Sequence, residues 1–257
     1  MKLQERDKQI LQKVFMFMCL RCLQIAELFD MHIKICQRRL RALVKGDYLR
    51  KILIPTTESG RSPYLYYPGK SAEELFGIQG YKPRLTNQLS HQQKNTDLLI
   101  HLKKSADRAG IKCSLLPEHL IRISGQTLIP DGTLALTRES KSALFFLENC
   151  AGTEVIKSPN YNEDIENKLI RYAEIFQNNE IRFYCKFFEY NFQRFRLLYI
   201  TNSGKRLDSI SQIVKKHDSF GFIYMATKSA FLKNNIFAPI WSIPTKNEIS
   251  ASIIKER

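Results

Sequence analysis

The segment between residues 31 and 46 constrains the fold most, because its apolar and charged residues separate onto two sides of a helix. Cys36, Leu40 and Leu43 recur at the spacing of one helical face. The opposite side carries Lys34, Gln37, Arg38, Arg41 and Lys45. Gly46 is a natural C-terminal stop. The pattern predicts a helix that buries one stripe and exposes a basic one.

The flanking segments place this basic helix in a recognisable order. A helical pattern precedes it at residues 20–30, and another covers residues 6–18 with an apolar face. That apolar face comprises Ile10, Leu11, Val14, Phe15 and Met18. Two strand-like runs follow at 49–54 and 64–67, joined by a turn that carries Arg61. The order predicts a winged helix-turn-helix domain whose basic helix and wing tip contact DNA.

A basic stripe on a helix is more often a solvated face than a binding surface. Two observations favour DNA here. One is the order of helices and hairpin, and the other is the net charge of +15 with an isoelectric point near 9.6. Such an excess favours a polyanionic partner, nucleic acid before membrane. The candidate DNA-binding residues are Lys34, Gln37, Arg38, Arg41, Lys45 and Arg61.

No apolar run has the length of a membrane-spanning helix, so no membrane partner is expected. The apolar run from Val14 to Leu20 is followed by Arg21 and lacks a small-residue cleavage site. We therefore expect no signal peptide and a cytoplasmic location. The hydrophobic fraction of 44% suits a folded core, and 257 residues suffice for one large or two ordinary domains.

The chain has six cysteines, and one group of them has metal-ligand character. Cys19 and Cys22 form a C-x-x-C pair, and His32 and Cys36 follow. This set offers four zinc ligands, but the spacer is shorter than in ordinary zinc fingers. Cys36 is already explained as a core residue, and buried free cysteine is common. We expect buried thiols, with zinc as the alternative.

Breaks at Gly77, Gly80 and Pro83 predict a connector and a domain boundary near Leu85, giving domains 1–84 and 85–257. The second domain is predicted as helix, three strands, helix, strand, helix, strand. Its predicted elements are a helix at 90–109, strands at 119–124, 127–137 and 143–149, a helix at 163–177, a strand at 195–201, a helix at 204–217, a strand at 220–227 and a final edge strand at 239–244. The nearly unbroken apolar run at 143–149 predicts a central strand buried on both faces. The fold class is therefore α+β or α/β.

Pro130-Asp131 and, 17 positions later, Glu148 resemble the motif of the PD-(D/E)XK nuclease superfamily, whose order is αβββαβ. The resemblance implies that Asp131 and Glu148 would hold a divalent metal such as Mg²⁺ if this chain is active. In active members of the superfamily, a lysine two residues after the Glu positions the attacking water. This chain has Cys150 at that place. Lys168, on the next predicted helix, is a substitute found in some relatives. Tyr172 is at i+4 from Lys168 and is expected to point the same way.

The whole chain resembles the replication-relaxation family of plasmid-associated proteins. The matching segments are Arg6-Asp7, QIAELF, RRLRALVKGDYL, His91, IPDG, FLENCAGTE and KLIRY. The resemblance implies a winged-helix DNA-binding half joined to a nuclease-like half, with plasmid replication or transfer proteins as partners. Cys150 replaces an Asp common in that family, and Glu118 corresponds to an acidic residue before the second strand.

Three functions follow from these patterns. The first is a duplex DNA-binding protein of a mobile element, an accessory factor or transcriptional regulator, with a catalytically silent second domain and no cofactor. The second is an endonuclease that uses Mg²⁺, Asp131, Glu148 and Lys168. The third is a protein-interaction module tethered to DNA by the first domain. Winged-helix domains often act as homodimers, but no heptad pattern identifies an interface.

Overall fold

The computed structural model is a mixed α+β structure made of two compact units, Met1–Ile100 and His101–Arg257. The residues it describes are 2–54, 64–79, 83, 87–118, 121–123, 126–150, 164–244 and 249–253. The boundary between the units lies inside helix α5 (Asn87–Arg108). The boundary predicted near Leu85 lies just before this helix, whereas the compact units divide within it, after Ile100.

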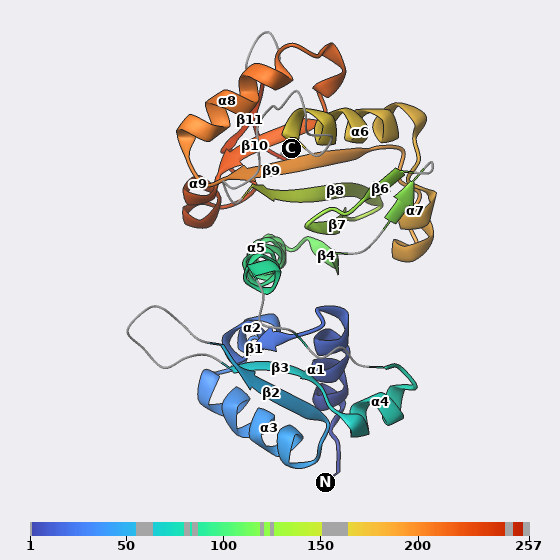
Figure 1. Ribbon diagram of the computed structural model, residues 1–257, viewed down its shortest axis with the longest axis vertical. Coiled ribbons are helices and arrows are strands. Elements are labelled where there is room, and N and C mark those ends of the chain that lie inside the picture. Colours follow the sequence, from blue (N-terminus) through green and yellow to red (C-terminus); the bar gives the residue numbers. More distant parts are fainter. Residues whose placement is uncertain are drawn as a thin grey trace. The chain divides into compact units, whose positions relative to one another are not determined.

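Before α5, the described residues of the first unit form four helices and a three-stranded sheet (Figure 1). Its elements are α1 (Glu5–Met16), β1 (Leu20–Arg21), α2 (Cys22–Leu28), α3 (Ile33–Lys45), β2 (Leu49–Leu53), β3 (Tyr64–Pro68) and α4 (Lys70–Phe76). The sheet is antiparallel, in the order β1-β3-β2. Strand β1 was not predicted, because a two-residue strand has no periodicity to detect.

The apolar stripes of α1 and α3 form the core of this unit. Ile10, Leu11 and Val14 are fully buried, as the spacing predicts. The predicted Met18 does not continue this face, since α1 ends at Met16 and Met18 has a left-handed φ of 62°. Phe17 is buried in its place. A buried carboxylate, Asp7, accepts hydrogen bonds from the guanidinium of Arg39 and so ties α1 to α3.

The second unit is built on a seven-stranded mixed sheet in the order β12-β11-β10-β9-β8-β7-β4. Its strands are β4 (Lys112–Pro117), β7 (Gly132–Arg138), β8 (Lys141–Cys150), β9 (Phe195–Thr201), β10 (Ile223–Thr227), β11 (Trp241–Ile243) and β12 (Ile249–Ala251). Strands β4, β7 and β8 pair antiparallel, and β8, β9 and β10 pair parallel. A separate hairpin consists of β5 (Ile121–Ile123) and β6 (Gln126–Leu128). An antiparallel start and a parallel continuation agree with the predicted order.

Helices complete this unit and connect the parallel strands. They are α6 (Ile165–Asn178), α7 (Arg182–Phe188), α8 (Gly204–Val214), the 3-10 turn η1 (Asp218–Phe220) and α9 (Lys228–Lys233). Side chains of α6 and α8 share one hydrophobic cluster with Phe146 of β8 and Leu197 of β9. Strand β8 is the predicted central strand, with every residue from Leu144 to Cys150 buried. This strand therefore fixes whatever lies at its C-terminal end.

Several predictions for this unit need correction. The predicted strand at 127–137 is broken at Pro130 and Asp131, because proline cannot donate to the ladder there. The predicted edge strand at 239–244 is β11, and β12 pairs outside it. Strand β4 and helix α7 were not predicted. No helix in the described part of the chain is long and apolar enough to span a membrane.

Candidate functional site

Helix α3 exposes one polar face and buries the other. Lys34, Gln37, Arg38, Arg41 and Lys45 are all exposed, as predicted. Cys36, Leu40 and Leu43 have no exposed surface. The helix starts at a local cap, where Nδ1 of His32 accepts a hydrogen bond from the backbone N–H of Lys34 at 3.3 Å. The exposed face can present four cations and one amide to a partner.

The hairpin β2–β3, which is part of this unit's sheet, adds cationic and aromatic groups. Its register pairs Leu49 with Pro68 and Leu53 with Tyr64. Lys51 is exposed, and its Nζ lies 4.4 Å from the centre of the Tyr64 ring, which is itself 42% exposed. Sequence reasoning missed this pair, although alternation along the two strands would place both side chains outward. The predicted contact residue Arg61 lies outside the described residues.

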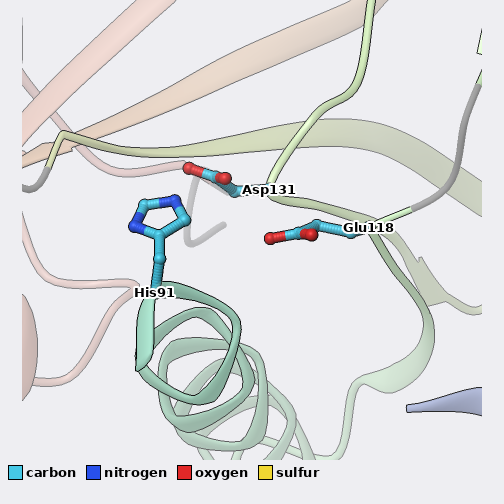
Figure 2. A group of neighbouring side chains, drawn as sticks. All are labelled: His91, Glu118 and Asp131. Atoms are coloured by element: carbon cyan, nitrogen blue, oxygen red, sulfur yellow. The ribbon is translucent and has the colours of Figure 1, made fainter. Parts of the chain in front are cut away.

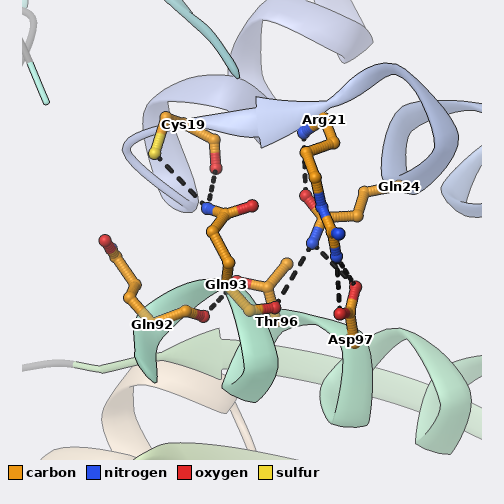
Figure 3. Close-up of polar contacts among 7 residues, drawn as sticks. All are labelled: Cys19, Arg21, Gln24, Gln92, Gln93, Thr96 and Asp97. Carbon is orange, nitrogen blue, oxygen red and sulfur yellow. Dashed lines mark hydrogen bonds and ion pairs between the residues drawn. The ribbon is translucent and has the colours of Figure 1, made fainter. Parts of the chain in front are cut away.

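Polar contacts anchor the N-terminal part of α5 in the first unit (Figure 3). The side-chain amide of Gln93 donates to the backbone oxygen of Cys19 at 3.4 Å. Arg21 forms an ion pair with Asp97, and Gln24 Nε2 donates to the same carboxylate at 2.8 Å. These contacts explain why the compact first unit extends past Leu85. Apolar periodicity carries no signal for them.

The four candidate zinc ligands make three different sets of contacts. Cys19 Sγ faces Gln93 at 3.5 Å, and burial raises the pKa of this thiol to about 12. The thiols of Cys22 and Cys36 lie 3.8 Å apart, and His32 caps α3. Within the described parts of the chain, these four side chains do not form a cluster with all ligand atoms within 4.8 Å. The geometry therefore lends no support to the zinc alternative.

In the second unit, three predicted residues meet at the C-terminal end of β8. Gly132 pairs with Leu147, which places Asp131 beside Glu148, and Asp131 Oδ2 accepts from the Asn149 N–H at 2.7 Å. Lys168, on α6, lies with its Nζ 2.5 Å from Glu148 Oε2. Tyr172, one turn later, donates its hydroxyl to Glu148 Oε1 at 2.5 Å. Lys168 and Tyr172 thus point the same way, as their spacing predicts.

Burial dominates the electrostatics of Glu148, whose exposed fraction is 2%. Burial raises its pKa from 4.5 to about 7, and the charge of Asp131 adds to the rise, while the charge of Lys168 opposes it. Burial also raises the pKa of Tyr172 well above its ordinary value. Lys168 is the counter-ion of this buried carboxyl.

A second cation contacts Cys150, two residues after Glu148. Arg206, on α8, donates from Nε to Cys150 Sγ at 2.7 Å. Helix α8 begins at this point because Ser203 caps it by accepting from the Arg206 N–H. Sequence reasoning missed Arg206, since its approach depends on the packing of a helix 56 residues further along the chain.

The site fits a metal ion poorly at Glu148. Both of its carboxylate oxygens already accept short hydrogen bonds, one of them from an ammonium group that would repel a cation. Glu118, just after β4, and Asp131 have carboxylate oxygens within 4.8 Å of one another (Figure 2). Oxygen pairs of this kind suit hard cations, yet part-exposed acidic groups are common without one. Figure 2 also labels His91, which is on α5 in the first unit.

No family model matches the sequence, and no curated protein matches it. Among solved structures, the chain is similar to restriction endonuclease FokI and to FokI bound to DNA, at 13% identity each. The TM-scores are 0.33 and 0.29. The matches cover 88% of this chain but only 42% and 43% of the FokI chains, less than half of their length. TM-scores of this size do not establish a shared fold.

Proposed function

We propose that this chain is a DNA-binding protein that inserts α3 of its first unit into the major groove of duplex DNA. The observation that carries the proposal is that α3 buries one side and exposes the other. Its apolar residues are fully buried, while four cations and Gln37 are exposed together on the other side. The order α1, β1, α2, α3, β2, β3 with an antiparallel sheet supports a winged helix-turn-helix.

The exposed residues of α3 and of the hairpin β2–β3 suit different parts of duplex DNA. Arg38 and Arg41 have planar guanidinium groups that can bind guanine or phosphate by two hydrogen bonds. Gln37 has the amide that can pair with adenine. Lys51 with Tyr64, on the hairpin, would lie along the phosphate backbone, as a wing does. The net charge of +15 adds long-range attraction to the polyanion.

For the second unit we propose a PD-(D/E)XK-like fold that does not cleave DNA. Support comes from the carboxylate site, where Lys168 and Tyr172 satisfy Glu148 without a cation. Such a protein could serve as an accessory factor or regulator of a mobile element, and for this role the sequence resemblance to the replication-relaxation family is the support.

The test is recovery of fragments from a random duplex pool by full-length protein at low salt. Wild type should recover duplex well above a protein-free background. Arg38→Ala should weaken binding by about 1–3 kcal/mol, which is about 5- to 150-fold in Kd. Arg6→Ala is the matched control, because Arg6 is an exposed arginine on α1. Equal recovery of duplex by Arg38→Ala and Arg6→Ala would show that α3 does not contact DNA.

One observation favours the nuclease alternative, namely the convergence of Asp131, Glu148 and Lys168 at the end of β8. Carboxylates at such a place could hold a metal if it displaced Lys168 from Glu148. Incubating supercoiled and linear DNA with the protein in Mg²⁺ or Mn²⁺ decides between the two. Cleavage that is lost in both Asp131→Ala and Glu148→Ala would make the nuclease function the better one.

A further inference from the structure

The second unit has a surface cavity of about 310 Å³ that is open to solvent, and most of the residues that line it are exposed. It lies between the C-terminal part of α5 and the end of α9. The polar residues that line it are His101, Ser105, Arg108, Lys233, Asn234 and Asn235. Its volume is at the small end for ligand sites, which suits a small polar group better than a large apolar molecule.

The charges in this cavity are of one sign. Arg108 and Lys233 both line it, and none of its lining residues in the described part of the chain carries a carboxylate. Neither cation forms an ion pair or hydrogen bond within the described portions of the chain, whereas the nearby Lys103 is neutralised by Asp107 at 2.7 Å. Two positive charges that face one concavity repel each other, and a bound anion would relieve that repulsion.

The other polar residues complete the lining and hold it in shape. His101 Nε2 lies 3.0 Å from the Phe231 backbone oxygen, and its ring packs on that of Phe231. Asn235 Oδ1 accepts from the Phe237 N–H at 3.0 Å, so its Nδ2 points the other way as a donor. Ser105 adds a hydroxyl on a largely buried side chain. The lining therefore offers more hydrogen-bond donors than negatively charged acceptors.

Two helix C-termini near the cavity work against an anion, since each carries about half a negative charge. Part of that charge is already satisfied, because the Ala230 oxygen accepts from Asn234 Nδ2 at 2.7 Å and the Ala106 oxygen from the Ile111 N–H at 2.9 Å. The two full positive charges of Arg108 and Lys233 exceed the partial negative charge that remains at the two helix ends. The balance favours an anion.

We propose that this cavity is a phosphate-binding site, occupied by a backbone phosphate of a nucleic acid or by a phosphate of a free nucleotide. The guanidinium of Arg108 would bind two phosphate oxygens side by side, and Lys233 would supply a point charge. The site is independent of α3, so it stands or falls separately from the DNA contact proposed above. A nucleic-acid phosphate here would give the second unit its own contact with DNA.

The test compares Arg108→Ala/Lys233→Ala with Arg182→Ala/Lys186→Ala, each as a full-length double variant. The control removes the same two charge types from exposed positions on α7. Calorimetry with inorganic phosphate and with ATP should show binding weakened about tenfold or more in the cavity variant only. Fluorescence of the single, buried Trp241 checks that both variants stay folded, and Lys233→Glu provides a second variant with the same expected loss.

Duplex DNA then separates the two sources of phosphate. A smaller salt dependence of DNA binding in the cavity variant than in the control, by about 0.9 in the log–log slope, would assign the site to the DNA backbone. An unchanged slope with lost ATP binding would assign it to free nucleotides. The proposal is overturned if the cavity and control variants match in phosphate binding, in ATP binding and in the salt dependence of DNA binding.

Discussion

Replacing Glu148 by Gln should change the pH dependence of stability in a defined direction. The side chain is 2% exposed, and its pKa rises from 4.5 to about 7 in the folded state. A folded-state pKa above the unfolded one means that the fold binds the proton more tightly. The stabilising contribution is therefore complete below pH 4.5 and is lost as the pH rises to about 7. At 1.36 kcal/mol per pKa unit, the loss is about 3 kcal/mol.

Glutamine does not titrate, so Glu148→Gln lacks this loss. The free energy of unfolding of the variant minus that of wild type should rise by about 3 kcal/mol from pH 4.5 to above pH 7. Urea unfolding at several pH values measures it, with fluorescence of Trp241, buried on β11 of the same sheet, as the probe. Titrating groups that do not interact with Glu148 cancel in the difference.

Glu174→Gln is the control, since it removes a carboxylate from an exposed position on the same helix that carries Lys168. A difference for Glu148→Gln that stays flat would refute the burial argument. A difference that falls with rising pH would show the opposite, that Glu148 is held as a carboxylate.

Three further outcomes are expected. Leu40→Ala should lower the free energy of unfolding by about 2–5 kcal/mol through loss of buried contacts, whereas Arg38→Ala should change it by less than about 0.5 kcal/mol; a large melting-temperature loss in Arg38→Ala would mean that α3 faces the other way. Elemental analysis should find well under one zinc per chain. Stoichiometric zinc that is lost in Cys22→Ser would show that the thiols of Cys19, Cys22 and Cys36 are zinc ligands. Asp131→Ala should leave supercoiled DNA as intact as wild type does in Mn²⁺, because Glu148 lacks a free carboxylate for the metal.

Short-range patterns predicted the parts of the fold that depend on neighbours in sequence. The spacing of Cys36, Leu40 and Leu43 placed the buried face of α3 correctly. The i, i+4 relation of Lys168 and Tyr172 predicted correctly that the two side chains point the same way. In each case a single helix or strand determines the direction of the side chains.

Long-range packing accounts for what the sequence did not predict. The contact of Arg206 with Cys150 joins residues from separate elements, and no local period encodes it. The polar contacts of Gln93 and Asp97 extend the first unit into α5 in the same way. Strand β4 was missed because its apolar residues, Leu115 and Leu116, are adjacent and show no alternation.

The salt dependence of duplex binding tests the central claim most directly, namely that the exposed face of α3 contacts DNA. Each phosphate contact contributes about 0.9 to the log–log slope of affinity against salt. In Arg38→Ala/Arg41→Ala/Lys45→Ala, we predict a slope smaller by about two to three than in wild type and in Arg6→Ala. The same slope and the same affinity in all three proteins would contradict the claim.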